Sequence, residues 1–145
     1  MMVLPDQLYS KLKKGLACVM ATVGADEFPH IGFAWAAARD SNTIWFAVDT
    51  HSRARANIQR TRKAALEIVA PGNLLYLVQG DCAIVKEDID APPLAMSIAE
   101  MQVRDVRDQS WAGVQVAPLA FRFEGKGADK FIAAEKKALA ALIAE

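Results

Sequence analysis

The stretch Ala47-Val-Asp-Thr-His-Ser-Arg-Ala-Arg-Ala-Asn-Ile58 decides the fold, because it joins a strand to a helix through a polar corner. The apolar run 43–48 predicts the strand, and Ser52 predicts an N-cap with Arg53 in the first helical turn. A helix N-terminus presents free backbone N–H groups and a partial positive charge, which attract phosphate. Thr50 and Ser52 would add hydroxyl donors, and Arg53 a fixed charge. The stretch favours an anion site; a solvated loop before a basic helix is the alternative.

Length and charge restrict the class of protein. The chain has 145 residues, which is enough for a single domain, residues 1–145, with a sizeable core. It carries 17 basic and 17 acidic residues, a balance that argues against a general nucleic-acid or anionic-membrane binder. Apolar residues make up 53% of the chain, so we expect some surface to be buried against a second subunit.

The N-terminus and the cysteines predict a cytoplasmic protein without a metal site. Residues 1–6 lack the basic segment and apolar core of a signal peptide. No apolar run approaches the roughly 18 to 20 residues that cross a bilayer. Cys18 and Cys82 fall within predicted strands, which is typical of two buried thiols in a reducing compartment. Neither has a CxxC neighbour or a cluster of histidines, so we expect no zinc site.

Apolar runs separated by turn residues predict an antiparallel sheet. We expect strands at 16–23, 28–38, 43–48, 63–69, 74–85 and 114–124. We expect helices at 5–14, at 52–60, from Asp90 to Met101, and at about 128–145. Gly80 within the fifth strand indicates a bulge or bend. Because turns alone join the first three strands, the pattern predicts a mainly β fold with added helices, a six-stranded antiparallel barrel.

The second predicted strand has one face of unusually small side chains. Alternation separates the large apolar side chains from the small ones, Ile31, Phe33 and Trp35 against His30, Gly32, Ala34 and Ala36. Small side chains allow another element to pack closely, and they also allow a flat ligand to lie against exposed backbone. Both interpretations stay open from the sequence.

The order of these motifs resembles the FMN-binding split-barrel family, which includes pyridoxamine 5'-phosphate oxidase-like proteins and small FMN-binding proteins. The resemblance covers about residues 4–85 and rests on Ala21-Thr22-Val23, Phe28-Pro-His-Ile31, Ile44-Trp-Phe-Ala47, His51-Ser-Arg53 with Ala56-Asn57-Ile58, and Val78-Gln-Gly80. It implies a homodimeric split barrel with two FMN molecules at the subunit interface. The implied function is that of a flavin-dependent oxidoreductase or electron carrier with a small-molecule or protein redox partner.

The resemblance also implies the residues that bind the flavin. The second strand would pass along the isoalloxazine ring at Phe33, Ala34, Trp35 and Ala36. The corner after the third strand would hold the phosphate through Ala47, Val48, Thr50, Ser52 and Arg53, with Asn57 as a companion. Trp111, in a polar loop, is a further candidate neighbour of the flavin. We assign no catalytic residue, because the chemistry belongs mainly to the cofactor.

The sequence departs from the oxidase pattern at three places. The second strand has no basic residue before Arg39, whereas the oxidases carry one there. Ala54 follows Ser52 and Arg53, where the oxidase usually has Lys, and the oxidase's C-terminal substrate-binding segment is not recognisable after Trp111. The alternative function is therefore a non-catalytic ligand-binding or sensing barrel that holds haem or deazaflavin instead of FMN.

Overall fold

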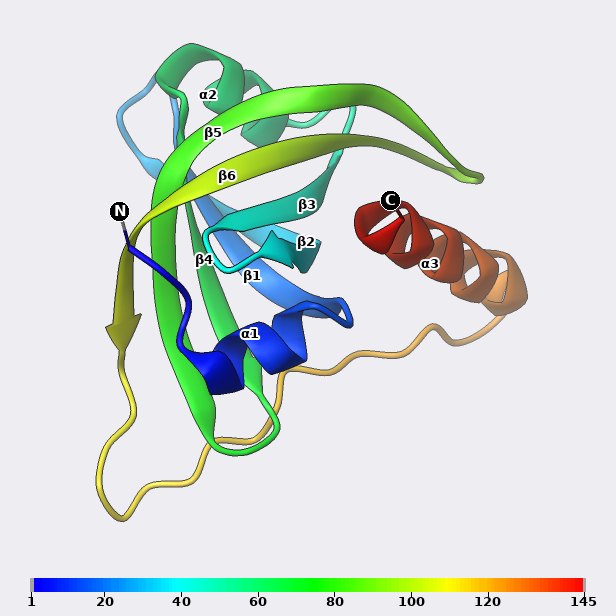
Figure 1. Cartoon of the computed structure of the whole chain (residues 1–145). Helices are drawn as coiled ribbons and strands as arrows, with labels where there is room; N and C mark the ends of the chain where they lie inside the picture. The colour runs from blue at the N-terminus through cyan, green and yellow to red at the C-terminus, as the bar shows by residue number, and fades with distance from the viewer. Residues whose placement is uncertain (1, 145) are drawn as a thin grey trace.

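The computed structural model describes residues 2–144 and consists of a barrel with three helices around it (Figure 1). The strands are β1 (Leu16–Val23), β2 (Pro29–Asp40), β3 (Thr43–Asp49), β4 (Lys63–Ala70), β5 (Leu74–Ala91) and β6 (Leu94–Asp108). The helices are α1 (Asp6–Leu12), α2 (Arg53–Thr61) and α3 (Ala128–Ile143). Residues 1 and 145, the ends of the predicted domain, lie outside the described part.

The strands form a closed antiparallel barrel in the order β1-β2-β3-β6-β5-β4. The predicted six-stranded antiparallel barrel with added helices is thus confirmed. Strand β2 pairs with β1 from Pro29 to Ala36, but it pairs with β3 only from Trp35 onward. The first half of β2 therefore leaves the edge that faces β3 unpaired. This opening positions the candidate site.

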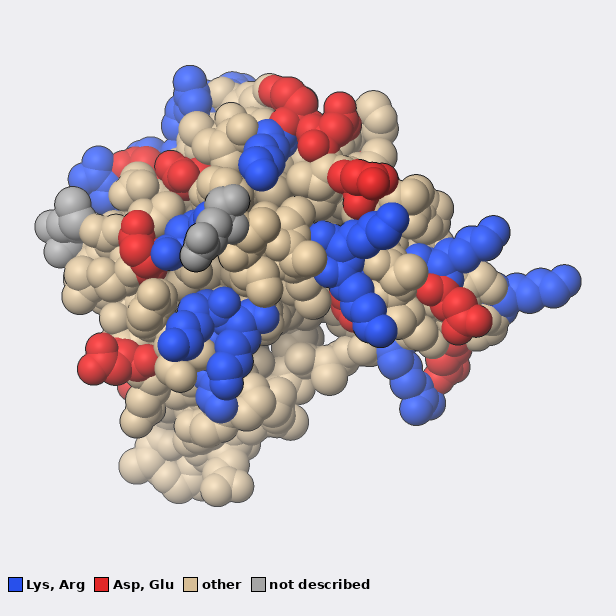
Figure 2. All heavy atoms as spheres, turned by 45° about the vertical axis from the view of Figure 1, so that its right-hand side comes forward, with Lys and Arg blue, Asp and Glu red and all other residues tan. Residues whose placement is uncertain are grey.

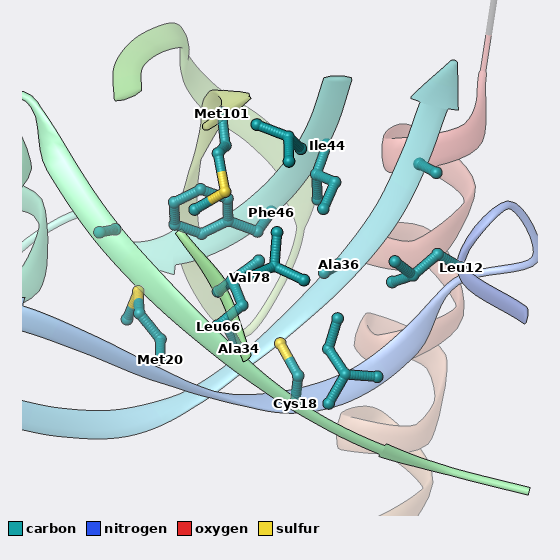
Figure 3. Close-up of a cluster of buried hydrophobic side chains, with 14 of the residues drawn as sticks. Leu12, Cys18, Met20, Ala34, Ala36, Ile44, Phe46, Leu66, Val78 and Met101 are labelled. Carbon is teal, nitrogen blue, oxygen red and sulfur yellow. The ribbon is translucent and has the colours of Figure 1, made fainter. Parts of the chain in front are cut away.

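One hydrophobic core fills the barrel and continues to both of its ends. Figure 3 shows side chains from several strands converging on this core, among them Phe46 and Met101. Leu8 and Leu12 of α1 belong to the same core, and so does Ile58 of α2 near the opposite end (Figure 1). Each fully buried side chain of this size stabilises the fold by about 1.5–3 kcal/mol.

Two of the small side chains on the small face of β2 belong to this core. Ala34 and Ala36 are buried, and Figure 3 places both among the core side chains. The packing interpretation of the small face therefore holds at these two residues, whereas His30 and Gly32 of the same face border an open groove. The outward face of β2 carries Phe33, which is 66% exposed, and the half-buried Trp35. A ligand on the outside of β2 would meet these aromatic side chains and the backbone.

The helix predicted from Asp90 to Met101 is wrong, because these residues form the hairpin between β5 and β6. Both faces of β6 are buried between Met96 and Ala99. Met101 packs in the barrel core, whereas Ile98 packs with Leu142 of α3. A strand covered on both faces loses its alternation of polar and apolar residues, and its apolar spacing then resembles that of a helix.

The strand predicted at 114–124 is also wrong. This segment belongs to an irregular connector, residues 109–127, which leads from β6 to α3 along the lower side of the molecule in Figure 1. The barrel is already closed by the pairing of β1 with β4, so the connector has no barrel edge to join. It is attached to the β4–β5 turn instead, where the Val116 N–H donates to Asn73 Oδ1 at 2.7 Å.

Helix α3 packs along the outside of the barrel. Its buried side chains recur every four residues, at Ala134, Ala138 and Leu142. Two hydrogen bonds fix it to β2: Trp35 Nε1 donates to Glu135 Oε2 at 2.9 Å, and Arg39 Nη1 donates to the carbonyl of Leu142 at 2.6 Å. Within residues 2–144, no helix combines the length and the apolar character that spanning a membrane requires.

Charged side chains of both signs are interspersed on the face shown in Figure 2. The lowest part of that face carries none. The stretch 110–121 of the connector likewise contains no Lys, Arg, Asp or Glu. The balance of basic and acidic residues in the chain is therefore also seen on this face, where neither sign of charge dominates.

Candidate functional site

An open groove lies where the unpaired first half of β2 meets the start of α2. Its volume is about 470 Å³, and it is lined by Met20, His30, Ile31, Gly32, Phe33, Asp49, Ser52, Arg53 and Ala54. The strand and the polar corner that the sequence singled out separately thus border the same space. The groove is open along β2, because β2 pairs with β3 only from Trp35 onward.

The N-terminus of α2 supplies hydrogen-bond donors at one end of the groove. Ser52 is used as the predicted N-cap: its Oγ accepts from the Arg55 N–H at 3.1 Å and donates to the carbonyl of Asp49 at 2.7 Å. The N–H groups of Arg53 and Ala54 have no acceptor within the described residues. The exposed Arg53 guanidinium likewise has no ion pair there. Two free amides and a free guanidinium form an anion-binding arrangement.

The second arginine of this helix serves another purpose. Arg55 forms an ion pair with Glu87, and its Nε donates to Ser97 Oγ at 3.2 Å. Thr50 Oγ1 lies 3.0 Å from the same Ser97 Oγ. Thr50 and Arg55 therefore connect the corner to the β5–β6 hairpin, and neither lines the groove.

A hydrogen-bonded network lies behind the groove. His30 Nε2 is 3.2 Å from Asp26 Oδ1, and His30 Nδ1 is 3.3 Å from Asn57 Nδ2. Because a carboxylate only accepts, we assign the ring proton to Nε2, which leaves Nδ1 to accept from Asn57. Asn57 Nδ2 also donates to Thr22 Oγ1 at 3.0 Å, and Asn57 Oδ1 accepts from Arg60 at 3.2 Å. The network thus braces the β1–β2 hairpin against α2.

The eleven predicted binding residues fall into distinct environments. Phe33, Ser52 and Arg53 line the groove, and Phe33, Ala34 and Trp35 line a smaller niche beside it. Ala36, Ala47 and Val48 are buried and line neither space, Asn57 is buried and hydrogen-bonded behind the groove, and Thr50 is hydrogen-bonded to Ser97 of β6. Trp111 lies in the connector, is 71% exposed, and lines neither space. Their contacts with a flavin stay predictions.

Sequence reasoning missed several residues that line the groove, namely Met20, Ile31, Gly32, Asp49 and Ala54. His30, which the sequence placed on the small face of the second strand, also borders this space. The motif Phe28-Pro-His-Ile31 was a signal for this part of β2. Its position beside the helix becomes visible only once the extent of strand pairing is known.

A second groove, the two cysteines and the potential metal ligands are less suited to form a functional site. A second open groove of about 490 Å³ lies outside the β1–β4 seam, but its Arg104 is paired with Asp81. Burial raises the pKa of the Cys18 and Cys82 thiols to about 12, so both stay protonated and unreactive. Within residues 2–144, no three His, Cys, Asp or Glu side chains gather in a way that would hold a metal ion. The groove at α2 is therefore the candidate site.

Solved structures share this fold at low sequence identity. An F420 reductase is 20% identical, with a TM-score of 0.61 over 73% of this chain and 100% of that one. A pyridoxamine 5'-phosphate oxidase-related, FMN-binding protein from Nostoc punctiforme is 12% identical, with a TM-score of 0.52 over 62% and 71%. HutZ, the haem storage protein from Vibrio cholerae, is 11% identical, with a TM-score of 0.54 over 74% and 95%. No curated protein sequence matches the chain.

The sequence itself matches a family. The sequence model described as pyridoxamine 5'-phosphate oxidase matches residues 4–101, which is well over half of the chain. The matched part runs from α1 into β6 and includes all residues of the groove, whereas the connector and α3 lie beyond it. The chain belongs to the pyridoxamine 5'-phosphate oxidase family.

Proposed function

We propose that this protein is an FMN-binding flavoprotein that acts as an oxidoreductase or electron carrier. The observation that carries the proposal is the free donor set at the start of α2, the amides of Arg53 and Ala54 with the Arg53 guanidinium, at one end of the groove. An anion bound there meets fixed donors and the positive end of the helix dipole. Membership of the family supports a flavin-type ligand or haem, and the phosphate of FMN matches this end of the groove.

The residues present fit the parts of FMN. Arg53 and the two amides would hold the phosphate, and the unpaired edge of β2 near Phe33 would lie along the ring. A bound flavin supplies hydride and electron transfer. The contribution of the chain is to bind and orient it. His30 is not a free proton donor in this arrangement, since Asp26 and Asn57 occupy both of its ring nitrogens.

Haem and deazaflavin are the competing ligands, and a direct comparison separates them. The chain is incubated in turn with FMN, with deazaflavin and with haem, passed through gel filtration, and its visible absorption spectrum recorded. We expect retention of about one FMN per chain. To ligate haem iron, one ring nitrogen of His30 would have to release its hydrogen-bond partner, Asp26 or Asn57, which disfavours haem. Retention of haem or deazaflavin in place of FMN would overturn the assignment.

We propose in addition that two chains form a homodimer beside the groove. Four large apolar side chains of β1, β2 and their connecting turn are more than half exposed, Val23, Phe28, Ile31 and Phe33. A cluster of this kind is typical of an interaction surface, and obligate homodimers bury roughly 2,000 Å² or more. Light scattering of the purified chain at micromolar concentration should return the mass of two chains. A monomer mass would contradict this part of the proposal.

A further inference from the structure

A small aromatic niche lies next to the groove, between the outward face of β2 and the connector. Its volume is about 150 Å³, and it is lined by Phe33, Ala34, Trp35, Met96, Phe121 and Phe123. Phe33 borders both the niche and the groove. Phe121 and Phe123 lie beyond residues 4–101, so one wall of the niche comes from outside the part that matches the family.

Phe121 is the central ring of this wall. Its centroid lies 5.9 Å from that of Phe33 and 6.4 Å from that of Trp35, with the planes tilted by 42° and 41°. Phe123 meets Phe121 edge-on at 5.6 Å and stacks on Phe131 of α3 at 5.5 Å. These separations are those of favourable aromatic pairs. The wall is therefore anchored on α3, and the tilt of Phe121 leaves space beside the rings of β2.

The lining of the niche has no free polar side chain. Trp35 carries the one side-chain nitrogen among the six lining residues, and that nitrogen donates to Glu135 Oε2 at 2.9 Å. An apolar cavity of about 150 Å³ lined by aliphatic and aromatic side chains holds a ring of the size of benzene. Phe33 and Phe121 are 66% and 43% exposed, so the mouth of the niche opens to solvent.

We propose that this niche binds a single uncharged six-membered aromatic ring, either a free molecule or the end of a larger one. The negative faces of the aromatic rings exclude an anionic group, because nothing in the lining compensates its loss of hydration. The volume excludes a fused three-ring system in the present arrangement of Phe121. Phe33 is shared with the groove, but no residue of the anion end contributes to the niche, so binding of a ring in the niche can be measured separately from binding of phosphate.

Methionine methyl groups report on this site directly. The chain contains five methionines; Met96 lines the niche, whereas Met101 lies in the barrel core. Fluorobenzene is titrated into the chain carrying ¹³C-methyl methionine, and the Met96 signal is assigned from the Met96→Leu variant. We expect a saturable ring-current shift of Met96 with a dissociation constant of about 1 mM or lower, and no shift of Met101.

Two variants test whether the ring occupies the niche. Phe121→Ala removes one wall and should weaken fluorobenzene at least tenfold. Val85→Ala removes an exposed apolar side chain outside the niche and should leave the affinity unchanged. The Met101 signal shows in each variant that the barrel core is intact. An absent or non-saturable shift of Met96, equal shifts of Met96 and Met101, or an unchanged affinity of Phe121→Ala would overturn the proposal.

Discussion

His30 and Asn57 are joined side chain to side chain, with 3.3 Å between His30 Nδ1 and Asn57 Nδ2, and this contact ties the beginning of β2 to helix α2. Asn57 is nearly completely buried, and it also donates to Thr22 Oγ1 of β1. His30 borders the groove on one side, and the first turn of α2 borders it on the other. The geometry of the anion end therefore depends on a buried amide behind it.

Replacement of this amide should destabilise the fold. Asn57→Ala leaves the ring nitrogen of His30 without its donor and removes the acceptor of Arg60, and a buried polar group left unpaired costs about 1–3 kcal/mol. We expect urea denaturation to show a fall in the free energy of unfolding of this size. Gln59→Ala, at an exposed position of the same helix, should change it by less than about 0.5 kcal/mol. Equal effects of the two substitutions would argue against the brace.

The stability should depend on the charge of Asp26 at acidic pH. The pKa of Asp26 is lowered from its ordinary value of 3.8, first by the hydrogen bond from the Phe28 N–H and then by His30. A lowered pKa in the folded state means that the carboxylate stabilises the fold. Its contribution is complete above the ordinary value and is lost as the pH falls through the folded pKa.

We therefore expect Asp26→Asn to be less stable than the parent at neutral pH, with a difference that shrinks as the pH falls below 3.8. Urea denaturation of both proteins across this pH range measures the difference. A difference that stays constant with pH would show that the lost stability does not come from the charge of Asp26.

Enlargement of Ala34 tests which side of β2 is the inner one. Its side chain lies in the barrel core, so Ala34→Leu should overpack the core and cost about 1–3 kcal/mol. Flavin bound on the outside of β2 should be retained. Ala133→Leu, at an exposed position of α3, is the matched control and should melt like the parent. Loss of flavin without a lower melting temperature would place the side chain of Ala34 in the ligand site instead.

Two glycines of the barrel, Gly80 of β5 and Gly32 of β2, should differ in their tolerance of a methyl group. A Cβ at Gly80 would lie 2.5 Å from Met101 Cγ and 2.9 Å from the carbonyl carbon of Gln102, so Gly80→Ala should lower stability by about 1–3 kcal/mol. A Cβ at Gly32 meets nothing within 4 Å, and Gly32→Ala should fold as well as the parent. Thermal unfolding compares them, and equal melting temperatures would contradict the close approach of β6 to Gly80.

Local sequence patterns predicted most of the fold. Turn residues and apolar runs predicted β1 to β5, the N-cap at Ser52 and the bulge at Gly80, where the register of β5 with β6 shifts. The errors at β6 and the connector have a different origin. Whether 94–108 or 114–124 supplies the sixth strand depends on which segment α3 covers and on the closing pair β1–β4. Both are tertiary contacts, and the spacing of residues along the chain does not predict them.

The candidate site was predictable in outline but not in detail. The sequence identified the corner and the helix start, because Ser52 and Arg53 are local signals. It did not show that Arg55 is paired with Glu87 or that Thr50 is bonded to Ser97, since both partners come from the distant β5–β6 hairpin. The aromatic niche was equally hidden, because Phe33 and Phe121 meet only through the course of the connector.

The binding of FMN and of riboflavin to Arg53→Ala tests the central claim most directly. A charge-assisted contact with phosphate is worth about 1.5–3 kcal/mol, so the variant should bind FMN at least tenfold more weakly and riboflavin as well as the parent does. Arg107→Ala is the matched control, since it removes the same charge from the exposed end of β6 and should change neither affinity. Flavin fluorescence titrations give all of these dissociation constants. Equal losses of FMN and riboflavin affinity in Arg53→Ala would mean that the phosphate does not bind at the start of α2.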